Sequence, residues 1–429
     1  MTDTAATTKS HSEASPRLVL AMLLIVYIFN FVDRQILAIL AAPIQQDLGL
    51  DDAQMGLLGG LAFAILYSTL GVPLASLADR TSRSWVITGS LVCWSAFTAA
   101  CGLAQGFWHI FLARLGVGIG EAGGVAPSYA VIGDHFPSEK RAFALSIYSL
   151  GIPLGSAAGV LAGGYVAARV DWRAAFFVVG LCGLLVAPVF RMVVRDKPRP
   201  KAVPGTVDDS ARLGHVAAIL ACKKAFWLLS FGAASSSMLG YGLAFWLPSL
   251  LQRSFGLDLV ETSWFIGAVL LIGGSAGVLL GGRLADRLGK ADRAFYGWVP
   301  ACAYIAAVPL FAAGIMTSSV PLAFALFLVP QALAYVWLGP VTSAIQHLVP
   351  PPARATASAL FLLINNLIGL GGGIYALGAL STALTPIYGS EALRTSMLIG
   401  LALYLVAALL MALAGPHLRR EWVEEVPAA

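Results

Sequence analysis

The chain has 429 residues, of which 58% are hydrophobic and only 11% are charged, and its formal net charge is +5. A soluble globular domain carries about 25% charged residues, so this composition excludes an ordinary soluble protein and indicates one that lies in a membrane. The positive net charge does not indicate a nucleic-acid partner, because no basic face with interleaved aromatic residues occurs in the sequence.

Apolar runs long enough to cross a bilayer occur twelve times along the chain. A spanning helix needs roughly 20 mostly apolar residues. The runs predict helices near residues 18–41, 55–78, 85–104, 107–133, 141–166, 172–193, 225–251, 263–285, 295–316, 320–346, 354–382 and 392–415. The first run is too long for a signal peptide and follows a polar start, so we expect a retained helix. The predicted fold class is an all-α integral membrane protein with twelve transmembrane helices.

The basic residues are distributed unevenly between the two sides of these spans. Of the 27 lysines and arginines, 21 fall on the side that holds both termini, which predicts that both termini are cytoplasmic. The segment 195–212 is rich in proline and charge, so it is expected to separate six spans from six. The expected units are a disordered cytoplasmic tail (1–16), an N-terminal six-helix bundle (17–195), a cytoplasmic linker (196–220), a C-terminal six-helix bundle (221–418) and a cytoplasmic tail (419–429).

A short loop motif occurs twice, about half a chain length apart. It reads LADRTSR at residues 77–83, after the second span, and LADRLGK at residues 284–290, after the eighth. Repeats at this spacing are typical of transporters with two parallel halves. The copies resemble the G-x-L-a-D-R-x-G-R/K motif of the major facilitator superfamily, although Ala75 and Ser82 replace two glycines in the first copy. The resemblance covers the whole chain and implies a secondary transporter with two pseudo-symmetric bundles, the major facilitator fold.

The charged residues of this motif predict a gate on the cytoplasmic side. An acidic residue at a helix end, beside basic residues in a tight turn, can make charge-assisted bonds to the neighbouring bundle in one conformation and lose them in the other. The alternative is that these residues only determine topology. The expected gate consists of Asp79, Arg80, Arg83, Asp286, Arg287 and Lys290.

Three further pieces of sequence resemble the Spinster family of lipid transporters. They are NFVDR at residues 30–34, GIGEA at residues 118–122, and the stretch from Pro127 to DHFP at residues 134–137. The resemblance implies a bacterial homologue in the inner (plasma) membrane. It also implies a substrate among lysophospholipids, sphingosine-1-phosphate-like lipids or related amphiphiles, with proton coupling proposed for some members.

Four strongly ionisable residues lie well inside the predicted spans: Asp33, Arg34, Arg114 and Glu121. Charges at the bilayer centre cost a few kcal/mol or more, so each is a candidate functional residue. Counting about 1.5 Å per residue places Asp33 level with Arg114, which predicts an Asp33–Arg114 pair with Arg34 turned away and Glu121 nearer the midplane. We expect Asp33 and Glu121 to exchange protons while the two arginines compete between these carboxylates and an anionic head group. The alternative is a permanent ion pair that only fixes helix packing.

The C-terminal spans contribute aromatic rather than charged candidates. We expect Trp227, Tyr241, Phe245, Trp246 and Asn365 to complete a substrate site with Arg34 and Arg114. A cavity that is charged on one wall and aromatic on the other suits a polar head with an apolar tail. The alternatives are that the rings face lipid and that the asparagine packs between helices. In span 5, glycines at positions 151, 155, 159 and 163 predict a close, sliding helix contact at which the halves rock.

The sequence contains no motif for metal binding, ATP hydrolysis or catalysis. The five cysteines and six histidines lack metal-ligand spacing, and no Walker A motif or catalytic constellation occurs. We therefore expect no cofactor, no metal and no catalytic residue. The expected partners are an amphiphilic substrate, protons and membrane lipids. We expect the protein to be a monomer. Three other functions stay open: a multidrug or organic-anion exporter of the same fold, a lipid-modifying membrane enzyme, and a non-transporting sensor, against which the complete second copy of the loop motif argues.

Overall fold

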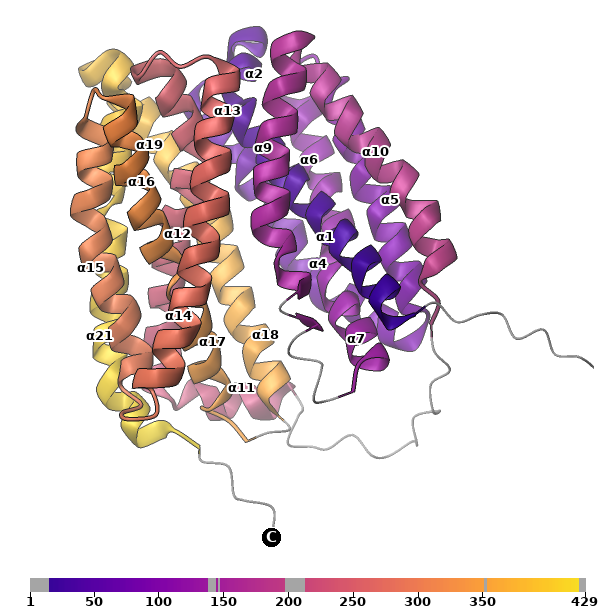
Figure 1. Cartoon of the computed structure of the whole chain (residues 1–429), viewed down its shortest axis with the longest axis vertical. Coiled ribbons are helices and arrows are strands. Elements are labelled where there is room, and N and C mark those ends of the chain that lie inside the picture. Colours follow the sequence, from indigo (N-terminus) through magenta and orange to yellow (C-terminus); the bar gives the residue numbers. More distant parts are fainter. Residues whose placement is uncertain (1–14, 138–143, 146, 197–212, 351–352, 424–429) are drawn as a thin grey trace, which may run out of the picture.

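The computed structural model describes residues 15–137, 144–145, 147–196, 213–350 and 353–423, without the side chains of Asp79, Leu213, Ala285, Asp286 and Ala355. The regular structure within these residues is helical (Figure 1). Eleven helical stretches are long and apolar enough to cross a membrane, and the last, Thr356–Glu421, has 66 residues, enough for two crossings. The predicted all-α membrane fold is therefore confirmed.

The first six spans form the N-terminal half. Several of the spans are divided into two shorter helices, and the short helix α2 follows the end of the first span. The elements are α1 (Pro16–Ile39), α2 (Ala41–Leu48), α3 (Asp52–Gly59), α4 (Leu61–Arg80), α5 (Arg83–Cys101), α6 (Phe107–Ala122), α7 (Val125–His135), α9 (Gly151–Arg169) and α10 (Trp172–Val193). The break between α3 and α4 falls at Gly60, whose backbone departs from helical geometry.

The C-terminal half contains the remaining six spans. They are built from α12 (Lys224–Ser254), α13 (Leu259–Ala268), η2 (Val269–Gly274), α14 (Ser275–Leu288), α15 (Phe295–Met316), α16 (Val320–Tyr335), α17 (Leu338–Gln346), α18 (Arg354–Ile364), η4 (Asn365–Gly372), α19 (Gly373–Tyr388), η5 (Gly389–Glu391), α20 (Ala392–Gly400) and α21 (Ala402–Glu421). The segments η2 and η4 are π-helical insertions, which occur frequently at functional sites.

The expected tails and linker lie partly outside the described residues. Within them, α1 already begins at Pro16, α21 continues to Glu421, and α11 (Leu213–Ala221) is helical inside the region expected to be linker. The start of α1 and the end of α21 lie toward the bottom of Figure 1, and α2 and the start of α13 lie at the top. We call the upper end, opposite the start of α1 and the end of α21, the distal end.

Aspartate caps begin three helices at the distal end. The side chains of Asp51, Asp171 and Asp258 accept hydrogen bonds from the backbone of α3, α10 and α13, each at 2.7 Å. Asp51 and Asp258 also form capping boxes with a residue three positions later. Such a cap stabilises a helix by about 1 kcal/mol, because it satisfies a backbone N–H that lacks a partner within the helix.

The glycine face of α9 packs within one half rather than between the halves. A Cβ on Gly155 would lie 2.5 Å from the carbonyl oxygen of Ile28, and one on Gly159 would lie 2.7 Å from that of Val32, both on α1. The contact with the other half is made by a different face, where Gly164 meets Ser263 of α13. The close helix contact expected at the glycines 151, 155, 159 and 163 is therefore confirmed, but the expectation of a rocking interface there is wrong, because these glycines pack α9 on α1 within one half.

Candidate functional site

A cavity between the two halves is lined by two of the four intramembrane charges, Arg34 and Arg114. It holds about 440 Å³ of empty space, including space open to solvent. The N-terminal wall comes from α1, α3, α4 and α6, and the C-terminal wall from α12, η4 and α19. The lining residues are Phe31, Arg34, Gln35, Ala38, Gly59, Phe63, Arg114, Tyr241, Ala244, Phe245, Leu370 and Ile374.

An ion pair between Arg34 and Glu121 forms the centre of the charged wall. Arg34 Nε donates to Glu121 Oε2 at 2.9 Å, and the Arg34 side chain is 12% exposed whereas that of Glu121 is fully buried. The guanidinium also lies over three rings, with its central carbon 4.7–5.1 Å from the centroids of Phe31, Phe63 and Tyr67. Such cation–π contacts keep the guanidinium in place while leaving donors available to the cavity.

The expected pair between Asp33 and Arg114 does not form within the described part of the protein. Asp33 turns toward α5, where it accepts a hydrogen bond from the Thr98 hydroxyl. Arg34, expected to turn away, instead lines the cavity. Consecutive residues of a helix point about 100° apart, so only one can face the cavity, and counting residues along an axis gives depth but not direction.

Several buried polar atoms at this site lack partners among the described residues. They include Asp33 Oδ1, Glu121 Oε1, both polar atoms of the Asn30 amide, and Nε and Nη1 of Arg114. Arg114 is only 2% exposed, yet it lines the cavity with its central guanidinium carbon 5.2 Å from the Phe63 centroid. A buried polar atom without a hydrogen bond costs roughly 1–3 kcal/mol, and more if charged. An anion in the cavity would meet donors that now have no acceptor.

The C-terminal wall contains two of the predicted aromatic residues. Tyr241 and Phe245 line the cavity, and the Phe245 ring lies so close to Gly59 that a Cβ there would be 2.3 Å away. Leu370 and Ile374 complete an apolar surface beside them. The cavity is thus charged on one wall and apolar on the other.

Three other predicted substrate residues lie outside this cavity. Trp227 is 40% exposed and donates to the Ala221 carbonyl at 3.2 Å. Trp246 is buried and donates to the Ile374 carbonyl at 2.9 Å. Asn365 accepts from Ser237 at 2.9 Å, which supports the alternative that it packs between helices. Aromatic composition alone did not distinguish rings at the cavity from rings in the packing.

The residues of the repeated loop motif do not join the two halves in the described structure. Arg83 forms an ion pair at 2.6 Å with Asp134, which belongs to the same half. Arg80, Arg287 and Lys290 are exposed and make no hydrogen bond or ion pair within the described residues. The side chains of Asp79 and Asp286 lie outside the described structure.

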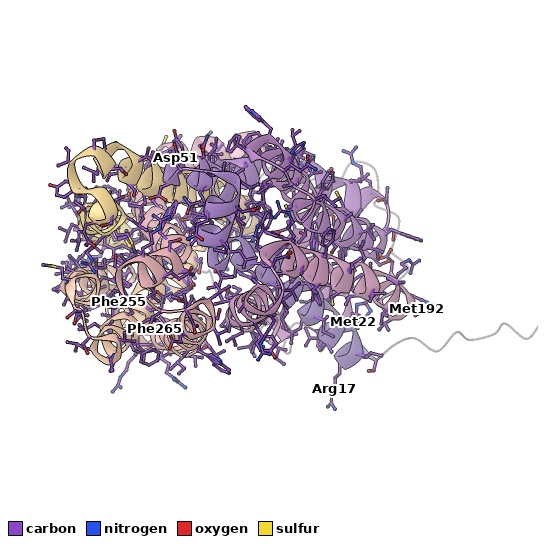
Figure 2. All side chains as sticks on the ribbon, turned by 90° about the horizontal axis from the view of Figure 1, so that it is seen from above. Arg17, Met22, Asp51, Met192, Phe255 and Phe265 are labelled. Atoms are coloured by element: carbon purple, nitrogen blue, oxygen red, sulfur yellow. The ribbon has the colours of Figure 1, made fainter. Side chains whose placement is uncertain are left out.

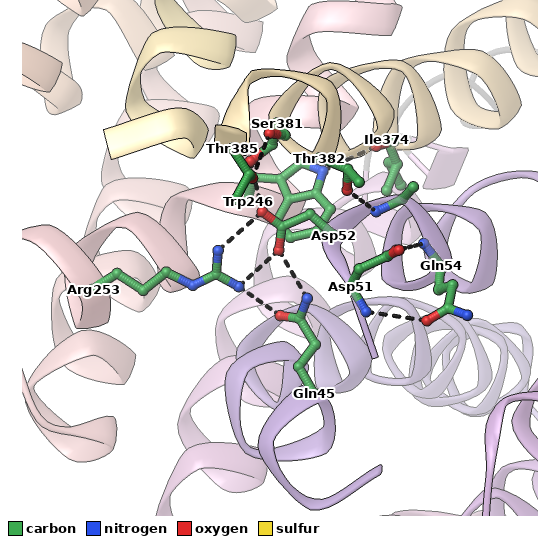
Figure 3. Close-up of polar contacts among 11 residues, drawn as sticks. Gln45, Asp51, Asp52, Gln54, Trp246, Arg253, Ile374, Ser381, Thr382 and Thr385 are labelled. Atoms are coloured by element: carbon green, nitrogen blue, oxygen red, sulfur yellow. Dashed lines mark hydrogen bonds and ion pairs between the residues drawn. The ribbon is translucent and has the colours of Figure 1, made fainter. Parts of the chain in front are cut away.

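A polar cluster that the sequence analysis missed joins the halves at the distal end. Arg253 of α12 donates to both carboxylate oxygens of Asp52, at 3.0 and 2.8 Å, and to Gln45 at 2.7 Å (Figure 3). Ser381 of α19 donates to the same carboxylate at 2.6 Å, and Thr382 accepts from the Ala53 backbone at 2.9 Å. We call this cluster the distal lock: Gln45, Asp52, Arg253, Ser381 and Thr382.

The distal lock lies directly at the boundary of the two halves. Figure 2 looks down on this end and shows Asp51, the neighbour of Asp52, where the N-terminal half meets helices of the C-terminal half. The sequence analysis did not single out Arg253 as a functional residue. The signal in the sequence was an arginine at the end of span 7 and two adjacent aspartates, Asp51 and Asp52, at the start of span 2.

Comparison with known proteins agrees with this geometry. The sequence profile of the Major Facilitator Superfamily matches residues 23–373. An MFS-type efflux pump of Mycolicibacterium smegmatis is 34% identical over 405 residues, covering 94% of each chain. Protein spinster homolog 1 of Homo sapiens is 27% identical over 393 residues, covering 86% of this chain and 73% of that one.

Two crystal structures of a bacterial homolog to the human lysosomal transporter Spinster are also similar. The inward-facing, unoccupied form has a TM-score of 0.88 and 30% identity, covering 96% of this chain and 99% of that chain. The inward-facing, occupied form has a TM-score of 0.84 and 29% identity over the same shares. Fold and sequence comparisons thus point to the same group of proteins.

Proposed function

This chain belongs to the Major Facilitator Superfamily, and on that premise we propose that it moves an amphipathic, anionic lipid-like substrate across the membrane by alternating access, coupled to protons. The superfamily consists of transporters, so secondary transport replaces the lipid-modifying enzyme as an explanation. Lysolipids and sphingoid phosphates are the substrate classes that combine a compact anionic head with one apolar tail. No cofactor is needed, because the substrate and proton gradients supply the free energy.

The observation that supports this proposal most strongly is that a charged wall and an apolar wall face each other in one cavity. Arg34 and Arg114 lie on one side, and Tyr241, Phe245 and Leu370 on the other. A phosphate head would accept hydrogen bonds from the guanidinium groups, which suit phosphate geometry. The tail would lie along the aromatic and aliphatic wall, where its burial is favourable by about 0.8 kcal/mol per methylene.

Coupling to protons would follow from competition for Arg34. In the described state Glu121 has one partner, Arg34 Nε, and its second oxygen has none. If an anionic head group takes Arg34, the fully buried Glu121 carboxylate loses its ion-pair partner, which is costly in a low-dielectric site. Proton uptake by Glu121 removes that cost, so substrate and proton would bind together. Asp33, held by Thr98 with one oxygen unpaired, is the second candidate proton carrier.

The proposal is tested with purified protein in liposomes under an imposed pH gradient. Glu121→Gln should abolish proton-driven accumulation of a lysolipid or sphingoid phosphate while retaining substrate exchange. Asp33→Asn should weaken the same coupling. Arg34→Gln should reduce substrate affinity by about 10- to 100-fold, as expected for the loss of a charge-assisted bond.

Arg173→Gln is the matched control, because Arg173 pairs with Asp47 at an exposed site away from the cavity. It should transport normally. Unchanged proton-driven transport by Glu121→Gln would refute the coupling, and uptake of sugars without uptake of lipids would refute the substrate class.

An exporter of drugs or organic anions is the second candidate function. It is favoured by the 34% identity to the mycobacterial efflux pump, which exceeds the identity to the human Spinster relative. The same cavity would serve either substrate, since both combine charge with apolar area. Competition between a lysolipid and an organic anion for transport in the same liposomes distinguishes the two, because only the preferred class should inhibit at low concentration.

We also propose that the protein works as a monomer in the bacterial inner membrane with both termini in the cytoplasm. The excess of basic residues on the terminal side supports this orientation. The distal lock would then close the periplasmic side, and the described state would be open toward the cytoplasm. A fluorescent protein fused to the C-terminus, which folds only in the cytoplasm, tests the orientation.

A further inference from the structure

A groove on the outer face of the N-terminal half has no role in the transport cycle proposed above. It lies between α4, α5 and α6 and holds about 670 Å³ of empty space, including space open to its surroundings. Its lining is almost wholly apolar and includes Leu74, Leu77, Trp85, Gly89, Cys93 and Ile119. Leu77, Trp85 and Ile119 are 40–58% exposed, so the groove faces outward, where the membrane lies.

The length and shape of the groove suit a single hydrocarbon chain. From Trp85 to Cys93 it follows α5 for about 12 Å along the helix axis. Its floor is open at Gly89, where an added Cβ would have no atom within 4 Å. A bilayer leaflet supplies acyl chains at this depth, and Trp85 lies at one end of the groove.

Arginine side chains lie at the end of the groove on the same side as the termini. The Arg191 guanidinium carbon is 4.6 Å from the centroid of the Trp85 ring. Within the described residues its one hydrogen bond is long, 3.5 Å from Nη1 to the Val194 carbonyl. Arg80 follows Leu77 by three residues on α4, hence on the same face, and it is exposed without an ion pair in the described structure.

Two acidic residues described near these arginines have other hydrogen-bond partners. Asp196 accepts from the Ser84 backbone at 2.9 Å and from the Ser82 hydroxyl, which ties the end of α10 to the start of α5 and holds Arg191 beside Trp85. Asp134 is paired with Arg83. Arg191 and Arg80 therefore lie near the mouth of the groove without an ion pair in the described structure, and the body of the groove is apolar.

We propose that this groove is a binding site for an anionic membrane phospholipid, such as phosphatidylglycerol, from the leaflet on the side of the termini. One acyl chain lies in the groove along α5, and the phosphate contacts Arg191 and Arg80. Basic pockets beside transmembrane helices recognise anionic head groups in this way. The site is separate from the central cavity, because no residue lines both.

The test uses quenching of Trp85 fluorescence by lipids with brominated acyl chains. The chain has ten tryptophans, so the Trp85 signal is taken as the difference between the full-length protein and Trp85→Phe. Brominated phosphatidylglycerol should quench this signal at about a 5- to 30-fold lower mole fraction than brominated phosphatidylcholine, given one or two arginines at the head group. Arg191→Gln should reduce that preference about fivefold.

Two further variants keep the test decisive. Gly89→Leu should place a side chain in the groove, since an added Cβ has no atom within 4 Å, and lower quenching by both lipids. Arg169→Gln is the matched control, because Arg169 also stacks on an aromatic ring, Tyr165 at 5.2 Å, but lies away from the groove. The proposal is overturned if the two lipids quench Trp85 equally, if Arg191→Gln retains the full preference, or if Gly89→Leu leaves quenching unchanged.

Discussion

At the scale of single residues, the properties of the site depend on which of its buried charged side chains are paired. Arg34 is kept in the cavity by Glu121 and by three aromatic rings, whereas Arg114 lines the same cavity with unpaired donors. An arrangement with every charge paired would be stable and inert. The unpaired donors of Arg114 leave a place for a substrate anion.

A surface pair shows the opposite case, a charge that serves only stability. Asp292, between α14 and α15, accepts from Arg419 Nε at 2.9 Å and from the Ala294 backbone at 2.9 Å. The hydrogen bond from Arg419 lowers the pKa of Asp292 from its ordinary value of 3.8 to about 2. Since the folded state favours the ionised form, the contribution to stability is present above pH 4 and is lost as the pH falls toward 2.

We expect Asp292→Asn to lower the free energy of unfolding by no more than about 1 kcal/mol at pH 7, because the pair is exposed. Thermal unfolding of the detergent-solubilised protein measures this difference, which should shrink between pH 4 and pH 2. Arg420→Gln is the control, since Arg420 has no ion pair within the described residues. A difference that persists unchanged at pH 2 would contradict the role of the charge.

At the scale of elements, close packing of α1 on α9 keeps the charged wall rigid. Glycines on α9 allow the backbones to approach, and α1 carries Asp33 and Arg34. Small residues serve this purpose in membrane helices because van der Waals contact, rather than the hydrophobic effect, drives their association. A substitution on α9 should therefore disturb the cavity even though no residue of α9 lines it.

Gly155→Ala should destabilise the protein, because the new Cβ would lie 2.5 Å from the Ile28 carbonyl oxygen and force the helices apart. Overpacking of this kind costs roughly 1–3 kcal/mol. The matched control is Gly71→Ala on α4, where nothing lies within 4 Å and the better helix propensity of alanine can stabilise by up to about 1 kcal/mol. Unfolding temperatures in one detergent compare the two, and equal values would contradict the packing argument.

At the scale of the whole molecule, alternating access requires contacts at one end that form and break as a unit. The distal lock has this character: the Asp52 carboxylate accepts from Arg253 and Ser381 of the other half and from Gln45 of its own half. Bidentate arginine–carboxylate pairs are strong and geometrically specific. The lock therefore favours the state that is closed at the distal end.

Arg253→Gln should shift the population toward the state open at the distal end by about 10- to 100-fold, since it removes charge-assisted bonds worth about 1.5–3 kcal/mol each. Spin labels at positions 170 and 387, exposed in opposite halves, would report a longer distance in a background without the five native cysteines.

Arg173→Gln is again the control, because the ion pair of Arg173 with Asp47 lies within one half. It should leave the distance distribution unchanged. Identical distributions for Arg253→Gln and the parent protein would show that the distal lock does not set the conformational equilibrium.

The charged wall shows how far sequence reasoning reached at the site. The four intramembrane charges were identifiable because insertion of a charge into hydrocarbon is costly, whatever the fold. Their partners were not, because Asp33 meets Thr98 and Arg34 meets Glu121 through side-chain directions that depend on helix rotation. The same limit explains why Tyr241 and Phe245 line the cavity while Trp227 and Trp246 do not.

The sequence by itself determined the spans, the two halves and the superfamily. Crossing a bilayer requires apolar runs of a minimum length, and a repeated loop motif marks duplicated halves, so both leave a local record in the chain. Only the tertiary structure decided the ion-pair partners, the shape of the cavity, the packing role of the α9 glycines and the distal lock. These depend on how helices rotate and approach one another, which joins residues such as Asp52 and Arg253 that are far apart in the chain.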